Sequence, residues 1–150
     1  MKWVVFFMSV ILLMGCNANK DQEDSKLALI KTTNPTPIQL EEKGPKVEEI
    51  KKEVERIDEI YDVAVIKDDH HILIAYKVKH LQRFRMKKIE KELNKRLEKE
   101  YKDEEFIVSS DYKIFLEVVR LREKIDAGTI NKKEAQKRFN EILELKKEMT

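Results

Sequence analysis

Three groups of side chains in this sequence could do chemistry. Cys16 carries the only thiol in the chain. Asp68-Asp69-His70-His71 places carboxylates next to imidazoles, and both groups are ligands of zinc. Ser109-Ser110-Asp111 places hydroxyl groups beside a carboxylate. The residues around each group indicate whether it is a reactive site or a structural feature.

The residues around Cys16 favour its modification. Lys2 precedes a nearly unbroken apolar run over residues 3–14, and polar residues follow Cys16 directly. A positive end, a short apolar stretch and a small residue before the cleavage site are typical of a secretory signal peptide. A membrane-spanning helix needs about 20 apolar residues, which is more than this run provides. We therefore interpret residues 1–15 as a signal peptide.

The end of this run, Leu13-Met14-Gly15-Cys16, resembles a bacterial lipobox. In a lipobox the peptidase cleaves before the cysteine, whose thiol forms a thioether with diacylglycerol. We expect Cys16 to become a lipidated N-terminus that carries acyl chains such as palmitate, because two chains anchor a protein stably. The alternative is an ordinary cleaved signal peptide followed by an unmodified cysteine. Lipidation would leave the mature chain without a disulfide or a thiolate nucleophile.

The other two groups are predicted to be structural. His70 and His71 are adjacent, so on a strand their side chains point to opposite faces, which favours a polar hairpin turn over a metal site. The serines and the aspartate at 109–111 precede an apolar helix, where such side chains cap free backbone N–H groups. We therefore predict no catalytic residue, no metal site and no cofactor.

Glycine is too sparse in the mature chain to build a phosphate-binding loop. Only Gly44 and Gly128 follow Cys16, and they lie far apart. This spacing argues against P-loop and dinucleotide-binding functions. Charged residues make up 40% of the chain with a net charge of +2, and aromatic residues only 7%, so the core is expected to be small and aliphatic.

Cationic residues cluster in one segment that only Glu90 interrupts. The members are Lys77, Lys79, Arg83, Arg85, Lys87, Lys88 and Lys91. Such a surface can bind anionic lipid, with about 1 kcal/mol from each cation near the membrane. The alternative is a solvated helix start whose charge is balanced by the acidic residues of 41–60. Nucleic acid is another common partner of basic surfaces, but it is not expected for an exported protein.

The chain is expected to divide into four segments. Residues 1–15 form the signal peptide, and residues 16–44, which are polar and contain two prolines, form a lipidated and flexible tether. Residues 45–128 form an α+β core domain. Residues 129–150 form a C-terminal helix.

Hydrophobic periodicity predicts an α-β-β-α-β core followed by an αα-hairpin. The expected elements are a helix from residue 45, strands over 61–67 and 71–78, a helix over 81–101, a strand over 106–109, and two helices within 111–149. The two strands that flank the polar turn form a hairpin, and the third strand follows a helical crossover that allows parallel pairing. We predict a three-stranded sheet with helices on one face. The αα-hairpin either packs on this core or binds a partner.

Four segments between residues 45 and 125 together resemble the YhcN/YlaJ family of sporulation lipoproteins from endospore-forming bacteria, and the likeness is closer to the YlaJ side. They are Ile57-Asp58-Glu59-Ile60-Tyr61-Asp62-Val63-Ala64-Val65, Ala75-Tyr76-Lys77-Val78, Gln82-Arg83-Phe84-Arg85-Met86-Lys87-Lys88-Ile89-Glu90 and Val108-Ser109-Ser110-Asp111-Tyr112-Lys113. The resemblance implies a spore-associated lipoprotein with a part in spore formation or germination. It carries over no catalytic residue.

These observations predict a non-enzymatic interaction or assembly module. Its expected partners are the lipid bilayer, through Cys16, and either another protein or a second copy of the chain. Its expected location is the cell or spore membrane, on the side facing away from the cytoplasm. The alternative function is peripheral binding to anionic membranes through the basic segment 77–91.

Overall fold

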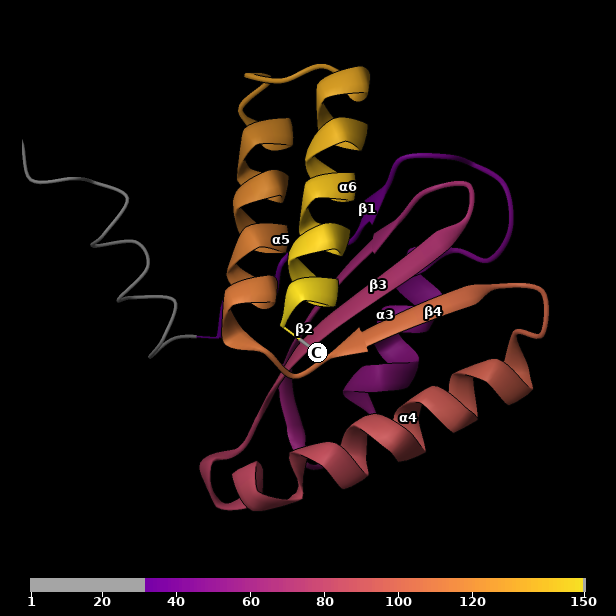
Figure 1. Ribbon diagram of the computed structural model, residues 1–150, viewed down its shortest axis with the longest axis vertical. Coiled ribbons are helices and arrows are strands. Elements are labelled where there is room, and N and C mark those ends of the chain that lie inside the picture. The colour runs from indigo at the N-terminus through magenta and orange to yellow at the C-terminus, as the bar shows by residue number, and fades with distance from the viewer. Residues whose placement is uncertain (1–31, 150) are drawn as a thin grey trace, which may run out of the picture. The chain divides into compact units, whose positions relative to one another are not determined.

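The computed structural model describes residues 32–149, which form an α+β fold around a mixed four-stranded sheet (Figure 1). Its elements are β1 (Ile38–Gln39), α3 (Val47–Glu55), β2 (Ile60–Lys67), β3 (His71–Val78), the 3-10 helix η2 (His80–Arg85), α4 (Met86–Glu100), β4 (Glu105–Ser109), α5 (Tyr112–Asp126) and α6 (Lys132–Glu148). The signal peptide and Cys16 lie outside the described residues.

The sheet has the strand order β1-β2-β3-β4. β2 and β3 form the predicted antiparallel hairpin, and β4 pairs in parallel with β3 after the α4 crossover, as expected. The prediction of three strands was wrong, because β1 pairs in parallel with the end of β2 through Ile38–Ile66 and Gln39–Lys67. β1 has only two residues and lies in the range predicted to be tether.

The segment before α3 is packed against the sheet at Gly44. This residue has a φ of +85°, and a Cβ there would collide with the side chains of Lys67 and Glu104. Those side chains form an ion pair, with Nζ and Oε1 3.0 Å apart and the lysine side chain only 2% exposed. Residues 32–44 therefore belong to the fold and do not form a flexible tether.

Helices cover both faces of the sheet, which corrects the prediction of one covered face (Figure 1). α5 and α6 bury Phe115 and Phe139 on the face formed by Leu73 and Ala75. α3 and α4 bury their stripes on the face formed by alternate residues of β3, including Ile74. Each large aliphatic side chain that is fully buried contributes about 1.5–3 kcal/mol of transfer free energy. The C-terminal helix is therefore part of the core.

The αα-hairpin ends its first helix and begins its second as the sequence predicted. Gly128 has a φ of +63°, the left-handed conformation common after a helix C-terminus. Asn131 and Glu134 form a capping box at the start of α6, in which each side chain accepts from the other residue's backbone N–H.

Candidate functional site

Lys77 was predicted to belong to an exposed basic surface, but it is buried. Its ammonium lies 2.9 Å from the Asp62 carboxylate, and the side chains are 6% and 0% exposed. The same nitrogen lies 4.7 Å from the centre of the Phe115 ring and 5.1 Å from that of Tyr61. The strand alternation explains this position, because Lys77 follows Leu73 and Ala75 on one face of β3. Lys77 therefore supports the fold and is not a contact for an external anion.

Asp62 also holds the first described residues of the chain. Its carboxylate accepts hydrogen bonds from the Thr33 backbone N–H (2.8 Å), the Thr33 hydroxyl (3.1 Å) and the Asn34 backbone N–H (3.1 Å). Lys51 Nζ donates to Asn34 Oδ1 at 2.6 Å and to the carbonyl of Pro35 at 2.7 Å. The chain thus enters the fold at a fixed point beside the start of β2.

The other members of the predicted basic surface lie on η2 and α4 or just before them. Lys79, Arg83, Lys87, Lys88 and Lys91 are exposed. Arg85 is partly buried, and it lies 3.4 Å from a Glu59 oxygen and donates to Gln82 at 3.2 Å. Lys88 lies 3.7 Å from Glu92, which is also exposed. The structure therefore keeps most of the predicted cations together on the outside.

Two apolar side chains stand among these cations. Leu81 is 77% exposed and Phe84 is 85% exposed, which are the highest values for large apolar residues in the described part of the chain. The α-helix predicted over residues 81–101 included both of them. The segment is instead a 3-10 helix with three residues per turn, so residues three apart project from the same side. This pattern places Phe84 on the same side of η2 as Leu81.

The Asp68–His71 cluster forms a hydrogen-bonded hairpin turn, as predicted. The Asp68 carboxylate accepts from the backbone N–H groups of His70 (2.9 Å) and His71 (2.7 Å) and from the Gln136 side chain (2.8 Å). Burial alone would raise the pKa of Asp68, but these hydrogen bonds outweigh it and lower the pKa below the ordinary 3.8. Over residues 32–149, no group of three or more possible ligands could hold a metal ion.

Replacing Asp68 by alanine is expected to reduce the free energy of unfolding at neutral pH by about 1–3 kcal/mol, because the N–H donors lose their acceptor. The folded pKa is lowered, so this stabilisation is present above the unfolded pKa and is lost as pH falls through the folded pKa. Urea denaturation at neutral and acidic pH measures both effects. Asp69 is exposed, so Asp69→Ala is the control. If Asp69→Ala and Asp68→Ala lost equal stability, the role of Asp68 as the acceptor in this turn would be contradicted.

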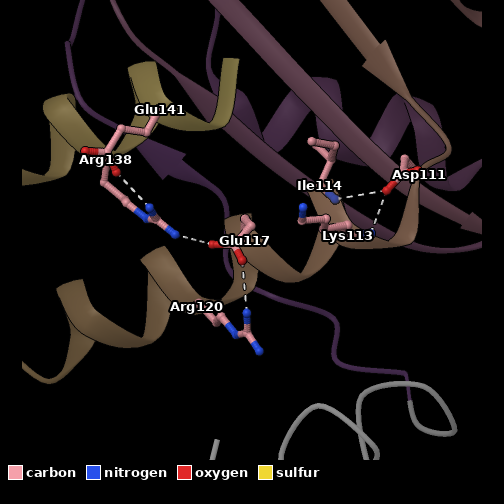
Figure 2. A network of polar contacts seen from close by, with 7 residues as sticks. All are labelled: Asp111, Lys113, Ile114, Glu117, Arg120, Arg138 and Glu141. Carbon is pink, nitrogen blue, oxygen red and sulfur yellow. Dashed lines mark hydrogen bonds and ion pairs between the residues drawn. The ribbon is translucent and has the colours of Figure 1, made fainter. Parts of the chain in front are cut away.

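The Ser109–Asp111 group caps α5, as the sequence indicated (Figure 2). Asp111 Oδ1 accepts from the backbone N–H groups of Lys113 (2.7 Å) and Ile114 (3.3 Å). The hydroxyl of Ser109 accepts from the Asp111 backbone N–H at 3.2 Å, and that of Ser110 donates to Glu90 at 3.3 Å. These polar groups are thus used to begin a helix and to link it to α4.

A charge network fastens α6 to α5 (Figure 2). Glu117 on α5 accepts from Arg120 at 2.9 Å and from Arg138 on α6. Arg138 also donates to Glu141 at 2.7 Å. Together with the buried stripes, this network supports self-packing of the αα-hairpin, which was one of the two roles left open by the sequence.

An open groove runs between α4 and β4, the last strand of the sheet. It has a volume of about 530 Å³. Its lining is Lys87, Glu90, Lys91 and Asn94 from α4 and Phe106, Ile107 and Val108 from β4. The sequence did not predict this groove, because it depends on the parallel pairing of β4 and on the angle of α4.

A family model described as sporulation lipoprotein YhcN/YlaJ matches residues 16–149. The chain belongs to the YhcN/YlaJ family. The match begins at Cys16, the residue predicted to carry lipid, and covers the prolines before the core and the last helix as well as the core itself. The sequence resemblance had covered only residues 45–125. The matched model represents YhcN and YlaJ together and does not separate them.

Membership in the YhcN/YlaJ family makes the protein a sporulation lipoprotein anchored at a membrane. No helix within residues 32–149 is long and apolar enough to cross a membrane. No curated protein and no solved structure gives a significant match to the chain.

Proposed function

We propose that this YhcN/YlaJ protein is a non-enzymatic module that binds a protein partner at the spore or forespore membrane and so contributes to spore formation or germination. Lipid attached to Cys16 would hold it on the side of the membrane facing away from the cytoplasm. The observation that carries the proposal is that, among residues 32–149, no strand pairs with the outer edge of β4, which lies beside the groove on α4.

The free edge of β4 suits the binding of an extended segment. Within the described sheet β4 pairs only with β3, so its other side presents backbone N–H and C=O groups that a further strand can bind. Lys87 and Lys91 line the adjoining groove beside the apolar side chain of Phe106. A partner segment with alternating acidic and apolar residues would complement this surface.

The polar groups that could have served catalysis have structural tasks instead. Asp68 holds the hairpin turn, and Asp111 caps α5. These uses support a binding role over an enzymatic one.

Photocrosslinking in sporulating cells tests the proposed partner site. A photoreactive amino acid in place of Glu105, which is exposed on β4, is expected to yield one discrete adduct. The same replacement at Glu123, which is exposed on α5, is the matched control and should yield none. Mass spectrometry of the adduct distinguishes another protein from a second copy of the chain. Equal labelling from both positions, or none from position 105, would remove the proposal.

A further inference from the structure

The segment from Lys79 to Lys88 combines exposed apolar and cationic side chains in a way that the fold does not use. η2 has no buried residue, and neither η2 nor the first turn of α4 contains an acidic residue. Leu81 and Phe84 are each more than three-quarters exposed, at 77% and 85%. Exposing large apolar groups to water is unfavourable, so their joint exposure on one short helix indicates a binding surface.

We refer to Leu81 and Phe84 on η2 as the apolar tip. The segment that carries this tip is held in a fixed conformation. The backbone N–H of Lys79 donates to the carbonyl of Glu59 at 2.9 Å, and that of Gln82 donates to the carbonyl of Lys79 at 2.8 Å. Arg85 contacts both Glu59 and Gln82. The start of α4 is then anchored by Ile89, which is 4% exposed. The two apolar side chains are therefore presented by a structured element.

The position of the tip relative to the chain entry points to the membrane. β2 begins and β3 ends at the pair Ile60–Val78, and η2 begins two residues after Val78. Thr33 is bound to Asp62, which pairs with Lys77 at the same end of the hairpin. Cys16 precedes Thr33 by 17 residues, so it can lie no more than about 60 Å from it. Thr33, the described residue nearest in sequence to the predicted lipid anchor among those bound to Asp62, thus lies at the same end of the hairpin as the tip.

We propose that Leu81 and Phe84 insert into the boundary between headgroups and acyl chains of an anionic bilayer, while Lys79, Arg83, Lys87 and Lys88 contact the lipid phosphates. A basic polar face beside apolar side chains is the composition of interfacial membrane-binding segments. Each cation near an anionic surface strengthens binding by about fivefold. This contact would orient the module on the membrane, and it does not depend on the protein partner proposed above.

Tryptophan fluorescence provides a direct test, because Trp3, the only tryptophan in the sequence, lies in the predicted signal peptide. The mature chain, residues 16–150, would carry Cys16→Ser to prevent lipidation and Phe84→Trp as the probe. Vesicles of equal parts phosphatidylglycerol and phosphatidylcholine should shift its emission to the blue, and lipids brominated in their acyl chains should quench it. Pure phosphatidylcholine vesicles should bind at least about tenfold more weakly. Tyr101→Trp, after the far end of α4, is the matched control and should show neither change.

Two variants separate insertion from simple adsorption. Leu81→Ser together with Phe84→Ser should weaken binding to the anionic vesicles, measured by sedimentation, at least about tenfold. Both side chains are exposed, so the free energy of unfolding measured by urea denaturation should be unchanged. Arg83→Glu with Lys87→Glu should weaken binding as well. The proposal is overturned if the serine variant binds as tightly as the parent chain, if the Trp probe at position 84 stays unquenched, or if no vesicle is bound.

Discussion

Replacing Asp62 by alanine is expected to lower the free energy of unfolding by about 3–5 kcal/mol. The carboxylate is fully buried and pairs with the Lys77 ammonium, which is itself 6% exposed. In the variant this ammonium would lose its nearest counter-charge in an interior that water does not reach. The desolvation cost of the lysine would remain, while the attraction of Asp62 that offsets much of it would be gone. Urea denaturation of the two proteins at neutral pH measures the difference.

A double-mutant cycle separates the charge pair from the other contacts of Asp62. Lys77→Met alone should also destabilise the protein, and Asp62→Ala with Lys77→Met should lose less stability than the two single changes added together. Asp58 is exposed in the preceding turn, so Asp58→Ala is the matched control and should change stability by less than about 0.5 kcal/mol. Losses that are equal for Asp58→Ala and Asp62→Ala would refute the role of the buried pair.

The same variant should also loosen the entry of the chain into the fold. Thr33 and Asn34 donate three hydrogen bonds to the Asp62 carboxylate. Without these bonds the backbone around residue 33 should be cleaved faster by a protease under conditions in which the sheet stays folded. This attachment lies between the predicted lipid anchor at Cys16 and the sheet, so we expect the loss of Asp62 also to loosen the proposed orientation of the module at the membrane.

The elements that the sequence predicted correctly have strong local signals. β2 and β3 are apolar runs on either side of a polar turn, and α5 and α6 begin at the caps Asp111 and Asn131. Such patterns depend on near neighbours and are therefore visible without a structure. β1 has no comparable signal. Its two residues follow two prolines, and only pairing with Ile66 and Lys67 makes them a strand.

The prediction that helices cover only one face of the sheet was wrong, although the sequence of β3 indicates two buried faces. On β3, Ile72 and Ile74 alternate with Leu73 and Ala75, so both faces of this central strand are apolar. A sheet with two apolar faces needs a layer on each side. Strand alternation also predicts an inward position for Lys77, whose charge had suggested the opposite. For Lys77, position on the strand decided burial more strongly than residue type.

The candidate site was predicted in part. Lys79, Arg83, Lys87, Lys88 and Lys91 are exposed on one segment, as expected. The apolar tip was not predicted, because residues 81–85 were assigned to the α-helix that follows. Phe84 lies two residues before Met86 and five before Ile89, so it is off the apolar stripe of α4, and in η2 it projects into solvent on the same side as Leu81.

Cys16→Ala is expected to abolish the incorporation of fatty acid and to release the protein from membranes. The thiol is the only group in the chain that can form the thioether, so the loss of label should be complete. Two acyl chains give stable anchoring because each buried CH₂ contributes about 0.8 kcal/mol, and the variant would lose all of it. Metabolic labelling with a palmitate analogue and membrane fractionation of sporulating cells measure the two effects.

The fractionation must separate lipid anchoring from the weaker contact proposed for η2. That contact depends on cations, and at 1 M salt charges are screened beyond about 3 Å. A wash at this concentration should remove Cys16→Ala from the membrane pellet and leave the wild type there. Asn17→Ala changes the neighbouring residue and keeps the thiol, so this control should remain labelled and membrane-bound. If Cys16→Ala still sediments fully after the wash, something other than lipid on Cys16 holds the protein at the membrane.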